Sequence, residues 1–202
     1  TGILFGMLLL GERPGAAVRA LPGEGTNVPI WILGSSLYGA QLAAHLGLPY
    51  AFASHFAPDD LDRALTLYRT NFRPSPWGQA PRTIMAINVF AADDPGQATF
   101  LRTTMQLAFA RLRTGMPGKL PRPVVDIDAE IGAQLRQGVD RALRISAVGD
   151  RAQVQDQLAQ LVGTYRPDEI ILTGQIHDHA ARLRSFELAA EAAQGLRLEN
   201  AA

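Results

Sequence analysis

The sequence predicts an α/β fold in which helices cover a parallel β-sheet. Segments typical of buried strands alternate with segments of helical periodicity along the 202 residues. Glycine and polar residues follow directly after several of these strands, at the end of a parallel sheet where α/β proteins hold their ligands. These candidate groups are Gly34–Ser36, Ser54–Phe56 and Gln175–His179. Four strands are expected, each followed by a helix: Val28–Leu33, Tyr50–Ala53, Thr83–Ala91 and Glu169–Thr173.

The stretch from Val28 to Leu48 shows this pattern most clearly. Six residues, almost all apolar, β-branched or aromatic, predict a buried strand, and Gly34-Ser35-Ser36 then leads into a helix that Gly47 ends. Such a turn directs unpaired backbone N–H groups and two hydroxyls at one point, where the helix dipole favours an anion. The turn is therefore a candidate phosphate site. The alternative is that Ser35 or Ser36 only caps the helix.

The second and third strands lead into helices with recognisable starts. Ser54-His55-Phe56 follows the second strand, and a helix is expected from Pro58, with Asp59 and Asp60 in its first turn. Asp94-Pro95 combines an N-cap residue with a proline at the first helical position, so a helix is expected there as well.

The region 114–134 interrupts the alternation. Its three prolines remove backbone donors and fix φ, so we expect a long irregular loop of the kind that is often functional. A short helix is expected over Arg136–Leu143. Asp150 and Gln153 form a capping-box pattern before another helix, and Asp178 is expected to cap the last one.

Composition argues against several classes of function. Lys and Arg together number 19, as do Asp and Glu, so the chain lacks the basic excess of a nucleic-acid or anionic-membrane surface. With no cysteine, it can form neither disulfides nor thiolate–metal bonds. No apolar run reaches the length of a membrane span. His177 and His179 lack a third ligand, so no metal site is expected. We expect a cytoplasmic protein with one core.

Several blocks of this sequence resemble a single family. They are I-L-G-S-S-L-Y-G-A-Q-L-A-A-H-L-G-L-P-Y-A-F-A-S-H-F-A-P (32–58), N-V-F-A-A-D-D (88–94), S-A-V-G-D (146–150) and Q-I-H-D-H-A-A-R-L-R-S-F-E (175–187). In this order they resemble the bacterial luciferase-like, flavin-dependent monooxygenases, and among these the MsnO8-like members. The resemblance covers nearly everything from Val18 onward. Several separate blocks in one order are more specific than any single motif.

The resemblance implies a (β/α)8 TIM barrel that uses reduced FMN, with the deazaflavin F420 as an alternative cofactor. It implies that Gly34, Ser35 and Ser36 seat the flavin phosphate, and that Ala53 and Ser54 lie near the flavin or the substrate. His55 would be a catalytic proton donor or base; the alternative is a loop histidine that bonds backbone. The implied partners are a small organic substrate, oxygen and a flavin reductase.

The four predicted β/α units resemble only the C-terminal half of such a barrel, which needs eight strands. Residues 28–202 would form this barrel portion, and residues 1–27 would be a leader or the end of the missing half. Half a barrel leaves two sheet edges and an apolar inner face uncovered. We therefore expect either a fragment of a longer product or a homo-oligomer. A non-catalytic half-barrel subunit that needs a partner is the alternative to an oxidoreductase.

Overall fold

The computed structural model describes residues 23, 26 and 28–196. The chain divides into two compact units, 1–31 and 32–202. In the first unit, the backbone N–H and the hydroxyl of Thr26 both donate to the Gly23 carbonyl, at 3.3 and 2.7 Å. Most of the predicted leader, 1–27, lies outside the described residues. All helices and strands described below belong to the second unit, and no described helix has the length and apolarity to cross a membrane.

The second unit contains a five-stranded sheet in which all pairings are parallel, so the predicted α/β architecture is confirmed. The strands are β1 (Ile32–Gly34), β2 (Tyr50–Phe52), β3 (Thr83–Ala91), β4 (Ser146–Gly149) and β5 (Glu169–Thr173). Strand β3 is the centre of the sheet. Ile84 pairs with both β2 and β5, and Asn88 pairs with both β4 and β5. Strands β2 and β4 therefore follow one another along one edge of β3, and β5 occupies the opposite edge.

Two strand predictions need correction. Strand β4 was not among the four expected strands, because four small residues are too short to show a periodicity. The first strand begins at Ile32 instead of Val28, and it is not buried on both faces. Its Leu33 is 72% exposed, because the helices cover only the other face of the sheet at this strand.

The helices follow the predicted order, with more of them between β3 and β4. They are α2 (Leu37–Leu46), α3 (Leu61–Asn71), α4 (Pro95–Arg113), α5 (Ile127–Ile131), α6 (Ala133–Ala142), α7 (Arg151–Tyr165) and α8 (His179–Ala193). Three predicted caps are confirmed: the Asp94, Asp150 and Asp178 side chains each accept a first-turn backbone N–H, and Gln153 completes the capping box. A 3-10 turn, Pro58–Asp60, precedes α3, which starts three residues later than expected.

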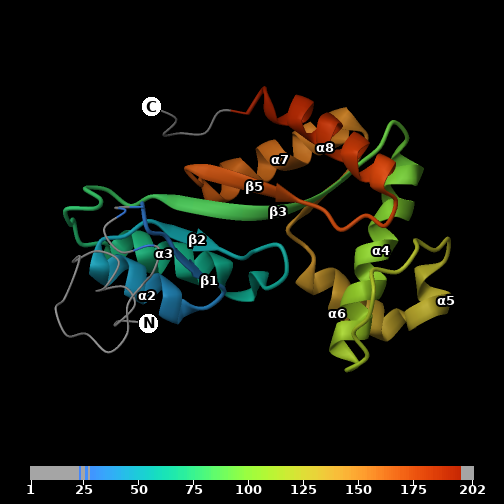
Figure 1. Cartoon of the computed structure of the whole chain (residues 1–202), viewed down its shortest axis with the longest axis horizontal. Helices are drawn as coiled ribbons and strands as arrows, with labels where there is room; N and C mark the ends of the chain where they lie inside the picture. Colours follow the sequence, from blue (N-terminus) through green and yellow to red (C-terminus); the bar gives the residue numbers. More distant parts are fainter. Residues whose placement is uncertain (1–22, 24–25, 27, 197–202) are drawn as a thin grey trace. The chain divides into compact units, whose positions relative to one another are not determined.

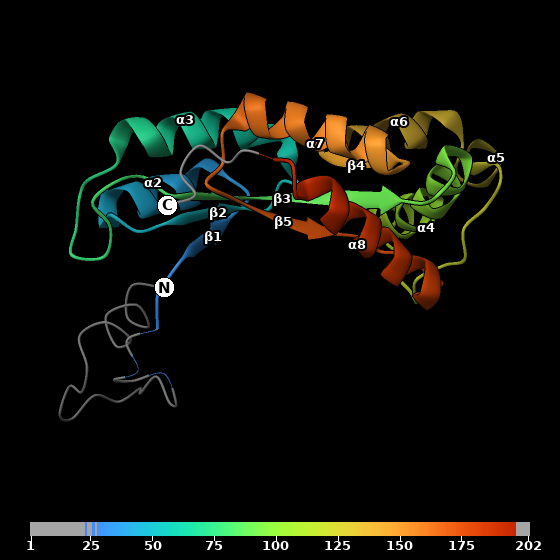
Figure 2. The same ribbon diagram turned by 90° about the horizontal axis from the view of Figure 1, so that it is seen from above.

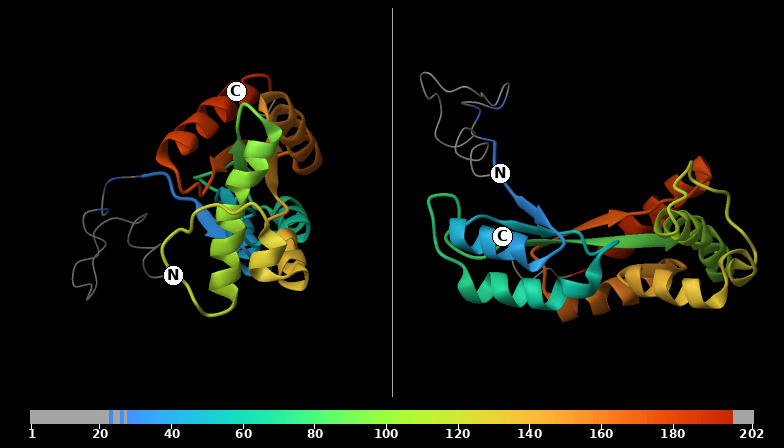
Figure 3. Two further views of the ribbon diagram at one scale, coloured as in Figure 1. Left: turned by 90° about the vertical axis from the view of Figure 1, so that its right-hand side faces the viewer. Right: turned by 90° about the horizontal axis from the view of Figure 1, so that it is seen from below.

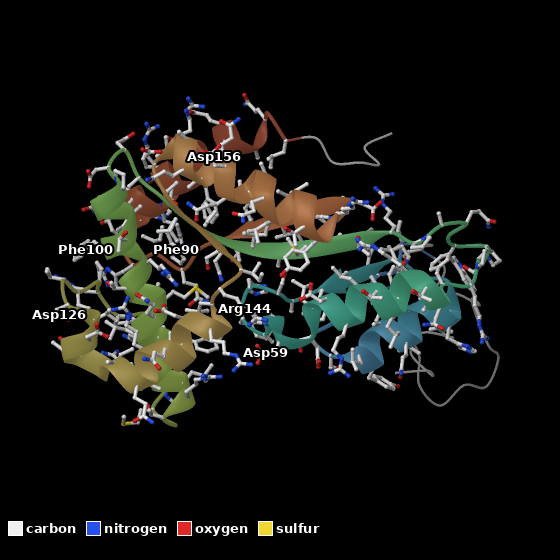
Figure 4. All side chains as sticks on the ribbon, turned by 180° about the vertical axis from the view of Figure 1, so that it is seen from behind. Asp59, Phe90, Phe100, Asp126, Arg144 and Asp156 are labelled. Carbon is white, nitrogen blue, oxygen red and sulfur yellow. The ribbon has the colours of Figure 1, made fainter. Side chains whose placement is uncertain are left out.

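The main hydrophobic core lies on one face of the sheet. Tyr50 and Phe52 of β2 and Met85, Ile87 and Val89 of β3 are buried there against α2, α3, α7 and α8. Figures 2 and 3 show α3 and α7 on the same side of β3, and Figure 4 views the molecule from that side. Full burial of a large apolar side chain stabilises the fold by about 1.5–3 kcal/mol, so this layer holds the sheet to its helices.

A second core lies at the carboxyl end of β3, where α4, α5 and α6 pack together (Figure 1). Phe90 points away from the main core and is buried in this cluster. Asp140 of α6 joins the helices, since it accepts from Arg102 at 3.0 Å and from Gln106 at 2.6 Å, both on α4. Arg144, just after α6, donates to Asp59 at 2.7 Å, and Figure 4 shows the two side chains together.

The expected irregular loop over 114–134 is shorter than predicted. Irregular structure ends at Asp126, whose side chain accepts the Ala129 N–H at 3.0 Å and so starts α5. Gly132, with φ of 77°, separates α5 from α6. The loop is also tethered, because the Val124 N–H donates to the Thr103 hydroxyl of α4 at 2.8 Å.

Gly47 provides a test of this arrangement. It ends α2 with φ of 64°, and an added Cβ would collide with the Arg73 carbonyl and the Ser75 side chain. We expect Gly47→Ala to lower the free energy of unfolding by about 2–4 kcal/mol, from left-handed strain plus overpacking. Urea denaturation measures the loss. The control is Gly115→Ala: φ is 76° but nothing lies within 4 Å of the added Cβ, so a loss of only about 1 kcal/mol is expected. Equal losses would contradict the steric explanation.

Candidate functional site

The predicted phosphate turn lies between β1 and α2 and is held closely against β2. A Cβ on Gly34 would lie 3.3 Å from the Gly39 Cα and 3.3 Å from the Tyr50 hydroxyl, so glycine permits the close approach of strand and helix here. The Tyr50 hydroxyl donates to the Ser36 carbonyl at 3.3 Å. Burial, together with the charge of Asp60, raises the pKa of Tyr50 to about 12, so the phenol keeps the proton that it donates.

The two serines of the turn are exposed. Ser36 occupies the N-cap position of α2 in extended conformation, with φ of −146° and ψ of 170°, but its side chain makes no capping hydrogen bond. The first turn of α2 carries no acidic residue. The first backbone N–H groups of this helix thus lack side-chain acceptors from the cap, and no acidic side chain of its own first turn compensates the positive end of the helix dipole.

The second strand end lies directly beside this turn. The Ala53 N–H donates to the Gly34 carbonyl at 2.9 Å. Ala53 and Ser54 are buried, and the Ser54 hydroxyl donates to the Ala86 carbonyl of β3 at 2.5 Å. The Ser54 hydroxyl therefore donates its proton to the backbone of the sheet. The role of Ala53 and Ser54 in cofactor binding stays a prediction.

The chain leaves the sheet at Ser54 because the pairing along one edge of β3 changes there. Strand β2 pairs with β3 as far as Met85, and β4 pairs with it from Asn88 onward. Between these two strands, the Ser54 side chain reaches the Ala86 carbonyl. Ligand sites of α/β proteins often open where the pairing partner of a strand changes in this way.

His55 follows at this point and is anchored through its backbone. The side chain of Asn88, which is fully buried in β3, donates from Nδ2 to the His55 carbonyl at 2.6 Å. The imidazole packs edge-on against Phe56, with ring centroids 4.7 Å apart. Within the described part of the chain, the buried His55 Nδ1 and Asn88 Oδ1 have no hydrogen-bond partner. Burial lowers the pKa of His55, which favours the neutral ring.

His55 lines a mainly apolar cleft of about 330 Å³. One wall comes from α4, and Gln175 approaches from the segment after β5. The lining residues are His55, Phe56, Met105, Ala108, Phe109, Leu112 and Gln175. The cleft can hold an apolar ring or chain, with one imidazole and one amide as its polar groups.

Sequence reasoning anticipated part of this cleft. Gln175 was expected among the polar groups that follow the strands, whereas the α4 wall and Asn88 were missed. The α4 wall could not be predicted, because only tertiary packing brings this helix to the cleft. Asn88 could have been noticed, because it is the one amide side chain in the apolar run T-I-M-A-I-N-V-F-A. His177 and His179 are exposed and do not line the cleft. Residues 23, 26 and 28–196 contain no group of three potential ligands that could hold a metal.

Comparison with known proteins shows which family this chain is similar to. The luciferase-like monooxygenase family matches residues 11–167. A luciferase-like monooxygenase of Escherichia coli (strain K12) is 50% identical over 183 residues, which are 91% of this chain and 55% of that protein. YvbT, an uncharacterised protein of Bacillus subtilis (strain 168), is 41% identical over 174 residues, 86% of this chain and 52% of its own length.

The crystal structure of apo-MsnO8 is similar to this chain with a TM-score of 0.70 and 29% identity, over 89% of this chain and 55% of that one. The predicted family and the predicted fold, a portion of a luciferase-like barrel, are confirmed. The chain spans about half the length of the curated relatives it matches.

Asn88 permits a test of how His55 is anchored. Because Asn88→Ala leaves the His55 carbonyl without its donor, we expect the free energy of unfolding to fall by about 1–3 kcal/mol. Denaturant titration measures the change. Asn71→Ala is the matched control: Asn71 also donates to a backbone carbonyl, that of Leu67 at 2.9 Å, but at an exposed position of α3, and a loss below about 0.5 kcal/mol is expected. Similar losses for both variants would argue against a special role for the Asn88 bond.

His55 should also make stability depend on pH. Its pKa is lower in the folded chain than the ordinary 6.5, so on acidification the unfolded chain takes up this proton first. Stability is therefore lost as the pH falls through the unfolded-state pKa. From about pH 7.5 to about pH 5.5, wild type should lose more stability than His55→Gln. Urea denaturation at each pH measures both slopes, and parallel slopes would contradict this assignment.

Proposed function

The chain belongs to the luciferase-like monooxygenase family, and on that premise we propose that it forms part of a flavin-dependent monooxygenase acting on a small organic substrate with oxygen. FMN is the proposed cofactor, with its phosphate on Gly34, Ser35 and Ser36 and its ring toward the His55 cleft. When bound, reduced flavin supplies the electrons that activate oxygen, so the protein needs little acid–base machinery of its own.

One observation carries this proposal: the Ala53 N–H donates to the Gly34 carbonyl at 2.9 Å. This bond makes the exposed serine turn and the strand end that leads to His55 direct neighbours. An anionic group at the turn and an aromatic group at the cleft can then belong to one molecule. A flavin mononucleotide has both groups.

The chemistry of the turn fits a phosphate. Two exposed hydroxyls and the first N–H groups of a ten-residue helix can donate to it, and no acidic side chain in the first turn opposes its charge. The helices α4, α7 and α8 begin with aspartate caps instead. Those carboxylates would repel a phosphate.

The cleft would serve the reaction by excluding water and by moving a proton. Phe56 and Phe109 contribute apolar surface, which favours burial of an aromatic ring. A neutral His55 can accept a proton at a ring nitrogen, because burial keeps its pKa low. A flavin reductase as electron source, and F420 as an alternative cofactor, belong to the proposal as further expectations.

Flavin binding tests this proposal. We expect the chain to quench FMN fluorescence with a micromolar Kd, and the double variant Ser35→Ala/Ser36→Ala to weaken binding about tenfold through loss of charge-assisted hydrogen bonds. Thr164→Ala is the control, because it removes a hydroxyl that bonds within α7 to the Gln160 carbonyl. Its affinity should equal that of wild type.

A folded wild-type chain that binds no FMN would overturn the proposal and favour a non-catalytic half-barrel subunit. Equal affinity of wild type and the double serine variant would place the phosphate elsewhere. Titration with F420 in the same assay separates the two cofactors.

A further inference from the structure

Two glycines and one tyrosine lie in close contact next to the serine turn. A Cβ on Gly39 would lie 3.3 Å from the Gly34 Cα and 3.4 Å from Cε2 of Tyr50, and a Cβ on Gly34 would lie 3.3 Å from the Tyr50 hydroxyl. Neither glycine has a positive φ, so both are needed for space and not for an unusual backbone conformation. The end of β1, the first turn of α2 and the phenol therefore pack directly against one another.

The Tyr50 hydroxyl acts on one peptide group of this turn. It donates to the Ser36 carbonyl at 3.3 Å. That carbonyl and the Leu37 N–H belong to the same planar trans peptide, so they point in opposite directions. Leu37 is the first residue of α2, and the N–H of a first helical residue has no acceptor within its own helix. The bond from Tyr50 therefore orients a donor that the helix itself does not use.

Tyr50 is in turn held in place by its surroundings. It is fully buried, and its ring packs against Phe52 and Tyr68, with centroids 6.1 and 5.4 Å away. Its backbone lies between Ile32 of β1 and Thr83 of β3 in the sheet. Because this ring is already ordered by packing, its hydroxyl can hold a carbonyl in one orientation at little further cost in side-chain entropy.

The aspartate caps of α4, α7 and α8 work in the opposite way. Each carboxylate accepts a first-turn N–H and so uses a donor that an anion would need. In α2, the Ser36 side chain makes no capping bond, and Tyr50 instead bonds the carbonyl of the first peptide. A hydrogen bond to a carbonyl also polarises its peptide, which strengthens the N–H as a donor. The turn is thus held without loss of its donors.

We propose that Tyr50 is a positioning residue that gives the turn its preference for a phosphate, because it holds the Ser36–Leu37 peptide with its N–H directed at the anion. The inference rests on the proposed function, in which the FMN phosphate lies on Gly34, Ser35 and Ser36. It assigns the choice between flavins to a buried side chain that acts through the backbone. The turn then selects FMN over riboflavin, which has the same ring and ribityl chain but no phosphate.

Binding of FMN and of riboflavin, each followed by quenching of its fluorescence, tests this assignment. Wild type should prefer FMN, and Tyr50→Phe should reduce that preference about threefold to tenfold, through loss of one hydrogen bond. Its affinity for riboflavin should not change. Tyr68→Phe is the matched control: this hydroxyl is also buried, but it donates to the Leu48 carbonyl at 2.9 Å. It should keep the wild-type preference.

A titration with inorganic phosphate gives a second readout, followed in the amide NMR spectrum of the isotope-labelled chain. Phosphate should shift the Leu37 amide resonance of wild type, and Tyr50→Phe should need about three to ten times more phosphate for the same shift. A wild type in which other amides of the turn respond and that of Leu37 does not would overturn the proposal. This result stands even if Tyr50→Phe fails to fold.

The outcomes separate this inference from the proposed function. If wild type binds FMN no more tightly than riboflavin, the phosphate does not lie on the turn, and both proposals are wrong. If the double serine variant loses the preference for FMN and Tyr50→Phe keeps it, the phosphate site stands and the role of Tyr50 is wrong. Equal losses of affinity for both flavins in Tyr50→Phe, or a lost preference in Tyr68→Phe, would indicate general structural damage and would also overturn the assignment.

Discussion

The pairing of β3 on both edges is the constraint on which the rest of the fold depends. Nine residues long, it pairs with β2, β4 and β5, whereas β1 reaches it only through β2. Its side chains alternate between the main helical core, which contains Ile87 and Val89, and the opposite face, where Phe90 meets the helices after β3. One strand thus connects both cores and fixes where the other strands end.

Those strand ends decide the electrostatics of the candidate site. Several helices start on aspartates, whereas α2 starts on an exposed serine turn with no acidic residue in its first turn. Close by, burial lowers the pKa of His55, which favours the neutral ring. An anion can therefore bind at one end of the site while the other end remains apolar. This separation suits a molecule with a phosphate and an aromatic ring.

Features encoded locally could be predicted from the sequence, and features that depend on distant segments could not. The caps Asp94, Asp150 and Asp178, and the turn at Gly47, follow from residues within one helical turn. The bounds of β3 followed from a long apolar run. Strand β4 was missed because four residues carry no period, and the cleft wall was missed because only tertiary packing brings α4 to His55.

The hydrogen bonds of Ser54 and Asn88 have a consequence for mutational data, because a substitution at either position would be poorly tolerated for structural reasons alone. Both side chains bond main-chain carbonyls where β2 gives way to β4, those of Ala86 and His55. In a deep mutational scan these positions would rank with cofactor-binding residues even if neither touched a ligand. Selection for a complete set of backbone hydrogen bonds and selection for chemistry therefore overlap at this strand end, and intolerance there does not by itself identify a ligand contact.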